Sequence, residues 1–212
     1  MLQIHTLVFS PFQENTYLVF DETNECAIVD PGMLTVAEEE KLMQTIDQLG
    51  LTPVLALQTH LHLDHVFGSR FVFEKFGLAP KAHPADAFLL EGIQTYARQF
   101  GFEMKENPPQ LDGFLRDNDE VVFGHTTLRV IHVPGHSPGG IVFYNAEASV
   151  LLAGDVLFRG SIGRSDLPGG NQHELIEGIQ AKLMVLPDEV QVYPGHGPAT
   201  NIGYERANNP FL

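Results

Sequence analysis

The sequence predicts an α/β protein in which sheets are covered by helices, and two observations carry this prediction. Apolar, β-branched runs of strand length recur along the chain, and amphipathic segments with helix-capping residues lie between some of them. The 212 residues are 43% hydrophobic and 18% charged, which is enough to bury a substantial core. Strands mixed with amphipathic helices in this way favour layered packing.

Three short strands are expected near the N-terminus, at residues 2–9, 16–20 and 25–29. A helix is expected to start at Thr35, because Glu38 follows at the spacing of a capping box, and to end at Gly50. Its apolar stripe, which belongs to the core, consists of Leu42, Met43, Ile46 and Leu49.

The remaining elements are predicted from the same patterns. Further strands are expected at residues 53–57, 81–83, 120–123, 126–133, 140–144, 150–153 and 190–193. Two more helical segments are expected at residues 66–76 and 84–100. A last helix is capped by Asn171, with Glu174 at the capping-box position. Its apolar stripe consists of Leu175, Ile176, Ile179 and Leu183.

The most informative stretch is residues 60–65, which read His-Leu-His-Leu-Asp-His. His60 and His62 alternate, so they lie on one side of an extended segment. Asp64 and His65 follow where the chain is expected to turn into a helix. Imidazole and carboxylate groups together suit zinc, iron or manganese, so we expect a metal site here.

Three further candidate ligands each follow an apolar, strand-like run and a Gly-containing turn: His136, Asp155 and His196. Ligands delivered from strand ends are what a rigid site on a sheet requires. The full set is too large for one tetrahedral ion. It suits two ions with three ligands each and one carboxylate between them.

With these residues the chain resembles the metallo-β-lactamase superfamily, whose pattern is His-x-His-x-Asp-His followed by His, Asp and His. Within it, the chain resembles short glyoxalase II-type (hydroxyacylglutathione hydrolase-type) proteins, from Asn15 to the Asn-Pro-Phe-Leu at residues 209–212. The resemblance implies an αββα sandwich of the metallo-β-lactamase fold, with metals at one edge of the two sheets. It also implies a single domain over residues 1–212.

The resemblance assigns His60, His62 and His136 to a first metal and Asp64, His65 and His196 to a second, with Asp155 as the bridge. The expected cofactors are two divalent transition-metal ions, zinc first, with iron or manganese as alternatives. Asp30 is implied to orient a ligand from beneath the metal loop. The alternative for Asp30 is a turn-initiating role before Pro31.

The implied reaction is hydrolysis of S-D-lactoylglutathione to D-lactate and glutathione. Two cations can share a water and lower its pKa towards about 7, and the resulting hydroxide attacks the carbonyl carbon. Asp64 and Asp155 are the implied catalytic residues. Arg159 and Arg164 are candidates for binding substrate carboxylates, with their planar forks of donors. Alternatively, either arginine only pairs with Asp166.

The chain departs from longer glyoxalase II enzymes. It is expected to lack their C-terminal helical region, which supplies further glutathione contacts. Positions where they carry glutathione-contacting tyrosines are Asp166 and Pro198 here. Weak glutathione binding, or another thioester substrate, is therefore consistent with the sequence.

Two rival functions remain. One is a persulfide dioxygenase of the same fold, which uses one iron held by residues matching His60, His136 and Asp155. The other is a non-catalytic metal-binding protein, which an intact ligand set disfavours. Hydrolysis of a different thioester or ester is a variant of the main prediction.

The composition of the chain argues against some binding partners and bears on the cellular compartment. The net charge is −15 with only 12 Lys and Arg, which argues against nucleic-acid binding. No apolar run approaches the roughly 20 residues that cross a bilayer, so no membrane association is expected. The single cysteine, Cys26, lies in an apolar run and is expected in the core. Together with the absence of a signal-peptide pattern, this fits a cytoplasmic protein acting on a small-molecule thioester.

Overall fold

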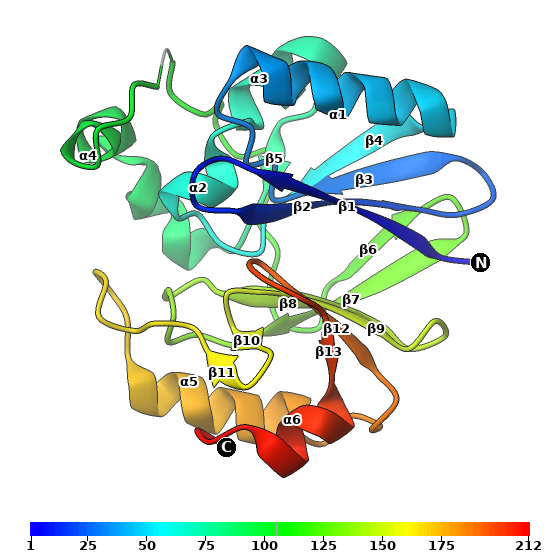
Figure 1. The fold of residues 1–212 in the computed structure, drawn as a ribbon, viewed down its shortest axis with the longest axis vertical. Coiled ribbons are helices and arrows are strands. Elements are labelled where there is room, and N and C mark those ends of the chain that lie inside the picture. Colours follow the sequence, from blue (N-terminus) through cyan, green and yellow to red (C-terminus); the bar gives the residue numbers. More distant parts are fainter. Residues whose placement is uncertain (105) are drawn as a thin grey trace.

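The computed structural model describes residues 1–104 and 106–212, which form four layers in the order helix, sheet, sheet, helix (Figure 1). Two mixed sheets face each other. Helices α1 (Val36–Leu49) and α3 (Ser69–Phe76) pack on the outer face of one sheet, and α5 (Gln172–Gly178) and α6 (Ile202–Asn208) on that of the other. The predicted αββα sandwich is confirmed.

The first sheet has the strand order β1-β2-β3-β4-β5. Its strands are β1 (Gln3–Phe9), β2 (Glu14–Phe20), β3 (Glu25–Val29), β4 (Thr52–Leu57) and β5 (Pro80–Lys81). The first three strands pair antiparallel, whereas β3, β4 and β5 run parallel. The parallel β3–β4 connection is made by α1, so β4 ends at the same edge as β3.

The second sheet has the order β13-β12-β9-β8-β7-β6, and β12 is parallel to β9. Its strands are β6 (Glu120–Phe123), β7 (Thr126–His132), β8 (Ile141–Asn145), β9 (Val150–Gly154), β12 (Gln191–Pro194) and β13 (Thr200–Asn201). A small hairpin of β10 (Leu157–Phe158) and β11 (Ser161–Ile162) follows β9. Because β9 and β12 are parallel, the residues after both strands meet at one edge.

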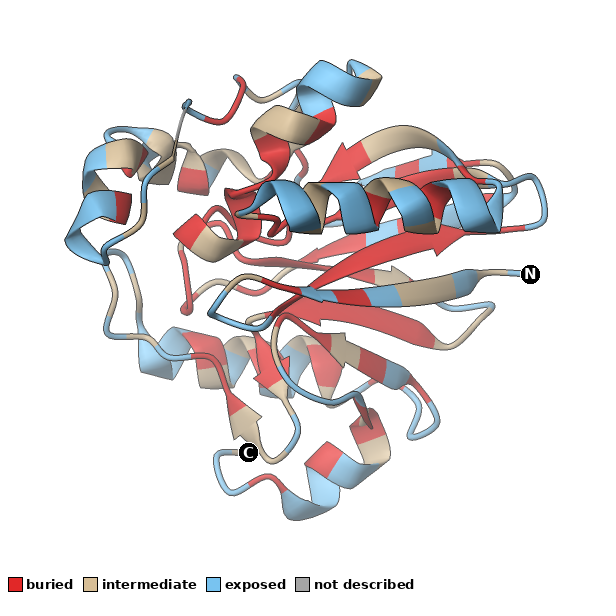
Figure 2. Cartoon of the chain, turned by 45° about the horizontal axis from the view of Figure 1, so that its top comes forward, coloured by how far each residue is buried: buried red, intermediate tan, exposed pale blue. Residues whose placement is uncertain are grey.

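Strand β2 explains how the layers are held together. Its alternate residues Tyr17 and Val19 belong to the core between the sheets, together with Phe143 of β8. Leu18 and Phe20 face the other way and join the core beneath α1. All of these side chains are buried. Figure 2 shows that the strands are largely buried, whereas the outer side of the long helix α1 is exposed. Both faces of the strand are therefore covered.

The predicted helix caps are present. Thr35 and Glu38 form a reciprocal capping box at the start of α1, and Gly50 ends the helix in the left-handed conformation. Asn171 accepts a hydrogen bond from the Glu174 backbone at the start of α5. A π-helical turn, η2 (Ile179–Leu183), continues α5.

Two helix predictions were wrong in detail. Residues 66–76 are not one helix: α2 (Leu63–Val66) and α3 are separated at Gly68, where an added Cβ would lie 2.9 Å from the Pro31 carbonyl oxygen. Residues 84–100 divide into the 3₁₀ helix η1 (Pro84–Leu90) and α4 (Ile93–Gln99), because Gly92 between them has φ +69°.

Smaller elements also differ from the predictions. The short strand predicted at 81–83 is β5, which ends at Lys81, and the sequence patterns did not reveal β10, β11, β13 or α6. Cys26 is fully buried, as expected. Among the described residues, no helix combines the length and apolar character needed to span a bilayer.

Candidate metal centre

The seven candidate ligands lie at one edge of the sandwich, where strands and loops end. Strand β4 leads to the loop with His60 and His62, and α2 follows directly with Asp64 and His65. The other three ligands come from the second sheet. They are His136 in the β7–β8 loop, Asp155 directly after β9 and His196 two residues after β12.

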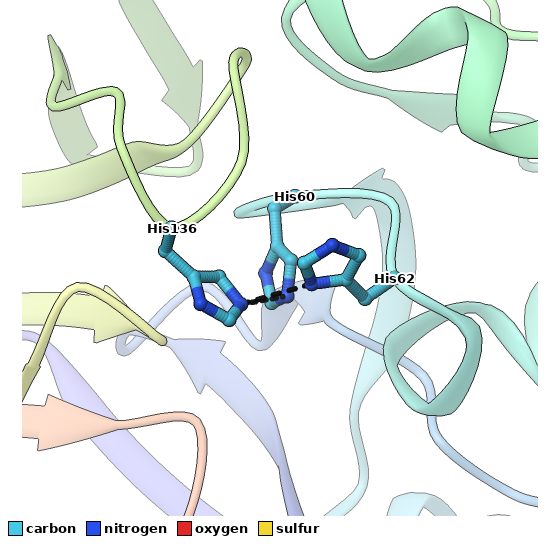
Figure 3. Close-up of side chains that lie close together, drawn as sticks. All are labelled: His60, His62 and His136. Atoms are coloured by element: carbon cyan, nitrogen blue, oxygen red, sulfur yellow. Dashed lines mark hydrogen bonds between the residues drawn. The ribbon is translucent and has the colours of Figure 1, made fainter. Parts of the chain in front are cut away.

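His60, His62 and His136 form the first trio, in which one ring nitrogen from each lies within 4.8 Å of the others. Figure 3 shows the rings converging from two different loops. Nε2 of His136 lies 2.9 Å from Nδ1 of His62 and 3.2 Å from Nε2 of His60. Three imidazole nitrogens around one point are the donor set of many catalytic zinc sites.

The protonation states suit ligands. Burial, together with the neighbouring imidazoles, lowers the pKa of His62 to about 3 and holds the pKa of His60 well below its usual range. Both rings are therefore neutral at pH 7 and present a lone pair. Only a neutral imidazole can bind a metal ion.

Asp64, His65 and His196 form the second trio. Nε2 of His196 lies 3.1 Å from Oδ2 of Asp64. Asp155 faces both trios: its Oδ2 is 3.5 Å from Nε2 of His136 and 3.5 Å from Nε2 of His196, and its Oδ1 is 3.4 Å from Nε2 of His65. One carboxylate thus lies between two groups of nitrogen and oxygen donors.

The geometry fits two bound cations. Among the described residues, buried atoms without a hydrogen-bond partner include Nε2 of His65 and Oδ1 of Asp155. Burial alone would lower the pKa of His65, but Asp155, Asp64 and Asp30 raise it well above its usual range. The carboxylates therefore favour positive charge at this point, which a metal ion supplies as well as a proton does.

Asp30 lies below His65, with its Oδ2 3.1 Å from Nδ1 of the ring. The Thr59 backbone donates to Oδ1 at 2.7 Å, and the Thr59 hydroxyl donates to Oδ2 at 2.6 Å. Both oxygens accept hydrogen bonds from Thr59, which hold the carboxylate where it can orient His65. Asp30 also forms a third group of possible metal-ligating side chains with His60 and His65. This placement suits the orienting role expected of Asp30.

Asp86 connects the two loops that carry the first trio. Its Oδ2 accepts hydrogen bonds from the Leu61 backbone at 3.2 Å and the Ser137 hydroxyl at 2.8 Å, and its Oδ1 accepts from the Gly139 backbone. Asp86 is fully buried in η1. The sequence patterns missed it, because an acidic residue in a predicted helix gives no sign that it turns inward.

A cavity of about 470 Å³ opens beside the ligands, and Asp64 and Asp155 are among its lining residues. Arg164 also lines it. The Arg164 guanidinium donates two hydrogen bonds to the Asp166 carboxylate, at 2.8 and 2.7 Å, and both side chains are exposed. Arg159 lies elsewhere, with its guanidinium 5.3 Å from the Tyr204 ring centre, and does not line the cavity.

Comparisons with known proteins agree with this geometry. Residues 9–196 match the family model described as the metallo-beta-lactamase superfamily. Hydroxyacylglutathione hydrolase GloC of Haemophilus influenzae is 38% identical over 218 residues, which cover 100% of this chain and 98% of that protein.

Two solved structures are similar to this chain over almost their whole length. TTHA1623, solved in a di-iron-bound form, is 39% identical with a TM-score of 0.88, over 98% of this chain and 100% of that one. The BLEG-1 B3 metallo-beta-lactamase is 33% identical with a TM-score of 0.88, over 100% of this chain and 99% of that one. The predicted metallo-β-lactamase fold is confirmed.

Proposed function

This chain belongs to the metallo-β-lactamase superfamily, and we propose that it is a metal-dependent thioester hydrolase. In this proposal, the metal centre catalyses hydrolysis of S-D-lactoylglutathione to D-lactate and glutathione. The observation that carries the proposal is the position of Asp155, whose carboxylate faces His136 of one trio and His65 and His196 of the other. The similarity to the hydroxyacylglutathione hydrolase GloC supports the choice of thioester.

Two divalent ions would be held by the two trios, with Asp155 between them. Zinc is the first choice, and iron or manganese are alternatives, since imidazole and carboxylate donors suit all three. When bound, such ions lower the pKa of a shared water and polarise a carbonyl oxygen. The TTHA1623 structure, described as di-iron-bound, makes iron a realistic alternative.

The protein's own groups orient the reactants. Asp64 and Asp155 line the cavity, and Oδ2 of each faces Nε2 of His196, at 3.1 and 3.5 Å. With the ions bound, a carboxylate oxygen of Asp64 or Asp155 that is not engaged by a cation would accept a hydrogen bond from the attacking water and orient it toward the thioester carbon. A thiolate is a weak base and therefore a good leaving group, because the pKa of a thiol is only about 8.5, so its departure needs little help from a general acid.

Arg164 is the candidate partner for a substrate carboxylate at the cavity, with Arg159 as a second, more distant candidate. Arg164 must first leave Asp166. An exposed ion pair is worth only about 0–1 kcal/mol, so a substrate anion can compete for the guanidinium. The expected partner in the cell is therefore a small anionic thioester in the cytoplasm.

The test is turnover of S-D-lactoylglutathione by metal-replete protein, by chelator-treated protein and by Asp155→Asn, with metal analysis of each. Asp155→Asn keeps the shape but removes the charge between the two cations, so metal content should fall and activity should drop more than about 100-fold. Asp47→Asn, an exposed carboxylate of α1, is the matched control and should behave as the parent.

Each of the two rival functions predicts a different experimental result. Oxygen uptake with glutathione persulfide, together with a single bound iron, would instead support the persulfide dioxygenase. Metal binding with no turnover of any thioester or ester would support a non-catalytic metal-binding protein. A parent protein that saturates at one ion per chain would remove the two-ion mechanism.

A further inference from the structure

The cavity beside the metal centre is lined by both polar and apolar side chains. The polar ones include the candidate ligands His62, His136 and His196. The apolar ones, called the walls below, include Phe12, Tyr96, Phe100, Phe158, Ile162 and Leu167. The lactoyl group itself presents only a methyl group and a hydroxyl, so it covers little of this apolar surface.

We propose that this cavity binds an aryl or similarly bulky apolar group attached next to the scissile thioester, so that thioesters carrying one are preferred over the lactoyl thioester. This rests on the proposed thioester hydrolase function and specifies its substrate class. The group can belong to the acyl side or to the thiol side, because both flank the reacting carbon.

The aromatic walls are partly open to solvent. Phe100 is 52% exposed and Phe12 is 37% exposed, although both line a concave site. Apolar surface removed from water contributes roughly 25 cal/mol per Å², so a ligand that covers these rings gains affinity from them. Exposed apolar surface in a concave site is typical of ligand binding.

Tyr96 and Phe100 of the lining pack against each other, and Phe12 packs against Phe102, which lies outside the lining. The rings of Phe12 and Phe102 lie 5.2 Å apart, and those of Tyr96 and Phe100 lie 5.0 Å apart at 71°. These separations are within the range of favourable aromatic pairs. A wall of this kind offers an incoming ring both edge and face contacts.

The cavity carries little positive charge. Among the lining residues that the structure describes, Arg164 is the only Lys or Arg, and its guanidinium also pairs with Asp166. With a net charge of −15, the chain provides little general attraction for an anion. The cavity therefore offers one cationic contact, at Arg164, beside a larger apolar surface.

The first experiment uses matched substrates with metal-replete protein. S-mandeloylglutathione differs from S-lactoylglutathione by a phenyl group in place of a methyl, which tests the acyl side. The lactoyl thioester of phenylmethanethiol, compared with that of glutathione, tests the thiol side. After division by the hydroxide-catalysed rates, kcat/KM should favour the aryl member by at least about 10-fold in one pair. No preference in either pair overturns the inference.

Two variants test whether the wall is responsible. Phe100→Ala should remove most of the aryl preference and leave the metal content unchanged. The control is Phe114→Ala, because Phe114 is 51% exposed, like Phe100, but does not line the cavity. Equal preference in the two variants would show that the group binds elsewhere.

A binding measurement separates this inference from the proposed function. S-benzylglutathione, a thioether that cannot be hydrolysed, should bind the parent and Phe114→Ala more tightly than Phe100→Ala in calorimetry. If it does so while no thioester is turned over, the hydrolase proposal fails and the cavity assignment stands. If lactoylglutathione is hydrolysed and neither turnover nor S-benzylglutathione binding depends on Phe100, the hydrolase proposal stands and the cavity assignment fails.

Discussion

Oδ2 of Asp30 lies 3.1 Å from Nδ1 of His65, and both side chains are buried beneath the candidate metal centre. This contact leaves Nε2 of the ring directed at Asp155 and Asp64, at 3.4 and 3.9 Å. Thr59 holds the Asp30 carboxylate from the other side with two hydrogen bonds. The Asp30 carboxylate therefore lies where it can orient the ring for metal binding.

Asp30→Asn should weaken metal binding at the second trio by about 10- to 100-fold, since a carboxylate behind a ligating imidazole fixes its orientation and raises its basicity. Asn suits the Asp30 backbone, whose φ is +50°, so strain is not introduced. Competition with a chelator measures the affinity, and circular dichroism checks the fold. Unchanged affinity in a folded variant would assign Asp30 to the turn alone.

Asp86→Asn should act mainly on the first trio, because Asp86 joins the Leu61 loop to the Ser137–Gly139 loop. An amide presents N–H groups where the carboxylate accepted hydrogen bonds, so one contact is lost and its donor is left unpaired. Metal stoichiometry should fall toward one ion per chain, with the remaining ion at the second trio.

Gly139→Ala is an independent way to make the same change. An added Cβ there would lie 2.6 Å from Cγ of Asp86 and would displace the carboxylate. Asp47→Asn again serves as the exposed control. If both Asp86→Asn and Gly139→Ala retain two ions with parental affinity, the loops are positioned by other contacts.

The local features of the fold were predictable from the sequence because local patterns determine them. The alternation of Tyr17, Leu18, Val19 and Phe20 distributes these residues between two cores, as expected for a strand buried on both faces. The Thr35 capping box formed as predicted. Likewise, the segments that follow β4, β7, β9 and β12 bring the seven candidate ligands to one edge, as the sequence predicted from their strand-like runs.

Features that depend on distant contacts were not predictable. Asp86 is 25 residues from Leu61 and 51 from Ser137, and nothing near it in the chain signals either partner. The break between α2 and α3 depends on the approach of Gly68 to Pro31 and Met33. The aromatic lining of the cavity comes from segments far apart in the sequence, so it emerged only in three dimensions.

The arginine assignment remains a prediction with a clear test. Arg164→Ala should raise KM for lactoylglutathione with less effect on kcat, because a contact remote from the reacting carbon binds ground and transition states alike. Asp166→Ala should lower KM for lactoylglutathione, since it frees the Arg164 guanidinium. Arg159→Ala should raise KM less, because Arg159 lies outside the cavity lining.

Salt provides the internal control for this assignment. Added salt should raise KM in the parent and less so in Arg164→Ala, because screening weakens exposed charge contacts. Metal content should stay constant in all three variants. If KM is the same in the parent and in both arginine variants at every salt concentration, glutathione carboxylates are recognised elsewhere.

Asp21 ties the two sheets together at the end of β2, and this contact should make stability depend on pH. Its carboxylate accepts hydrogen bonds from the Thr23 backbone and hydroxyl, the His125 backbone and the Thr126 hydroxyl. Burial alone would raise the pKa of Asp21, but these hydrogen bonds outweigh it and hold the pKa below its usual range. A lowered pKa means that the folded state binds fewer protons than the unfolded state near pH 3–4.

Asp21→Asn should therefore lower the free energy of unfolding by about 2 kcal/mol at pH 7, in line with hydrogen bonds to a charged group. The stabilisation from the charge is complete above the unfolded pKa of roughly 3.9 and is lost as pH falls toward the lower folded pKa. Urea unfolding of metal-free parent and variant at several pH values should show their difference shrinking below about pH 4. Metal-free protein is used because acid also releases metal. A difference that stays constant from pH 7 to pH 3 would show that the contribution of Asp21 is its shape and not its charge.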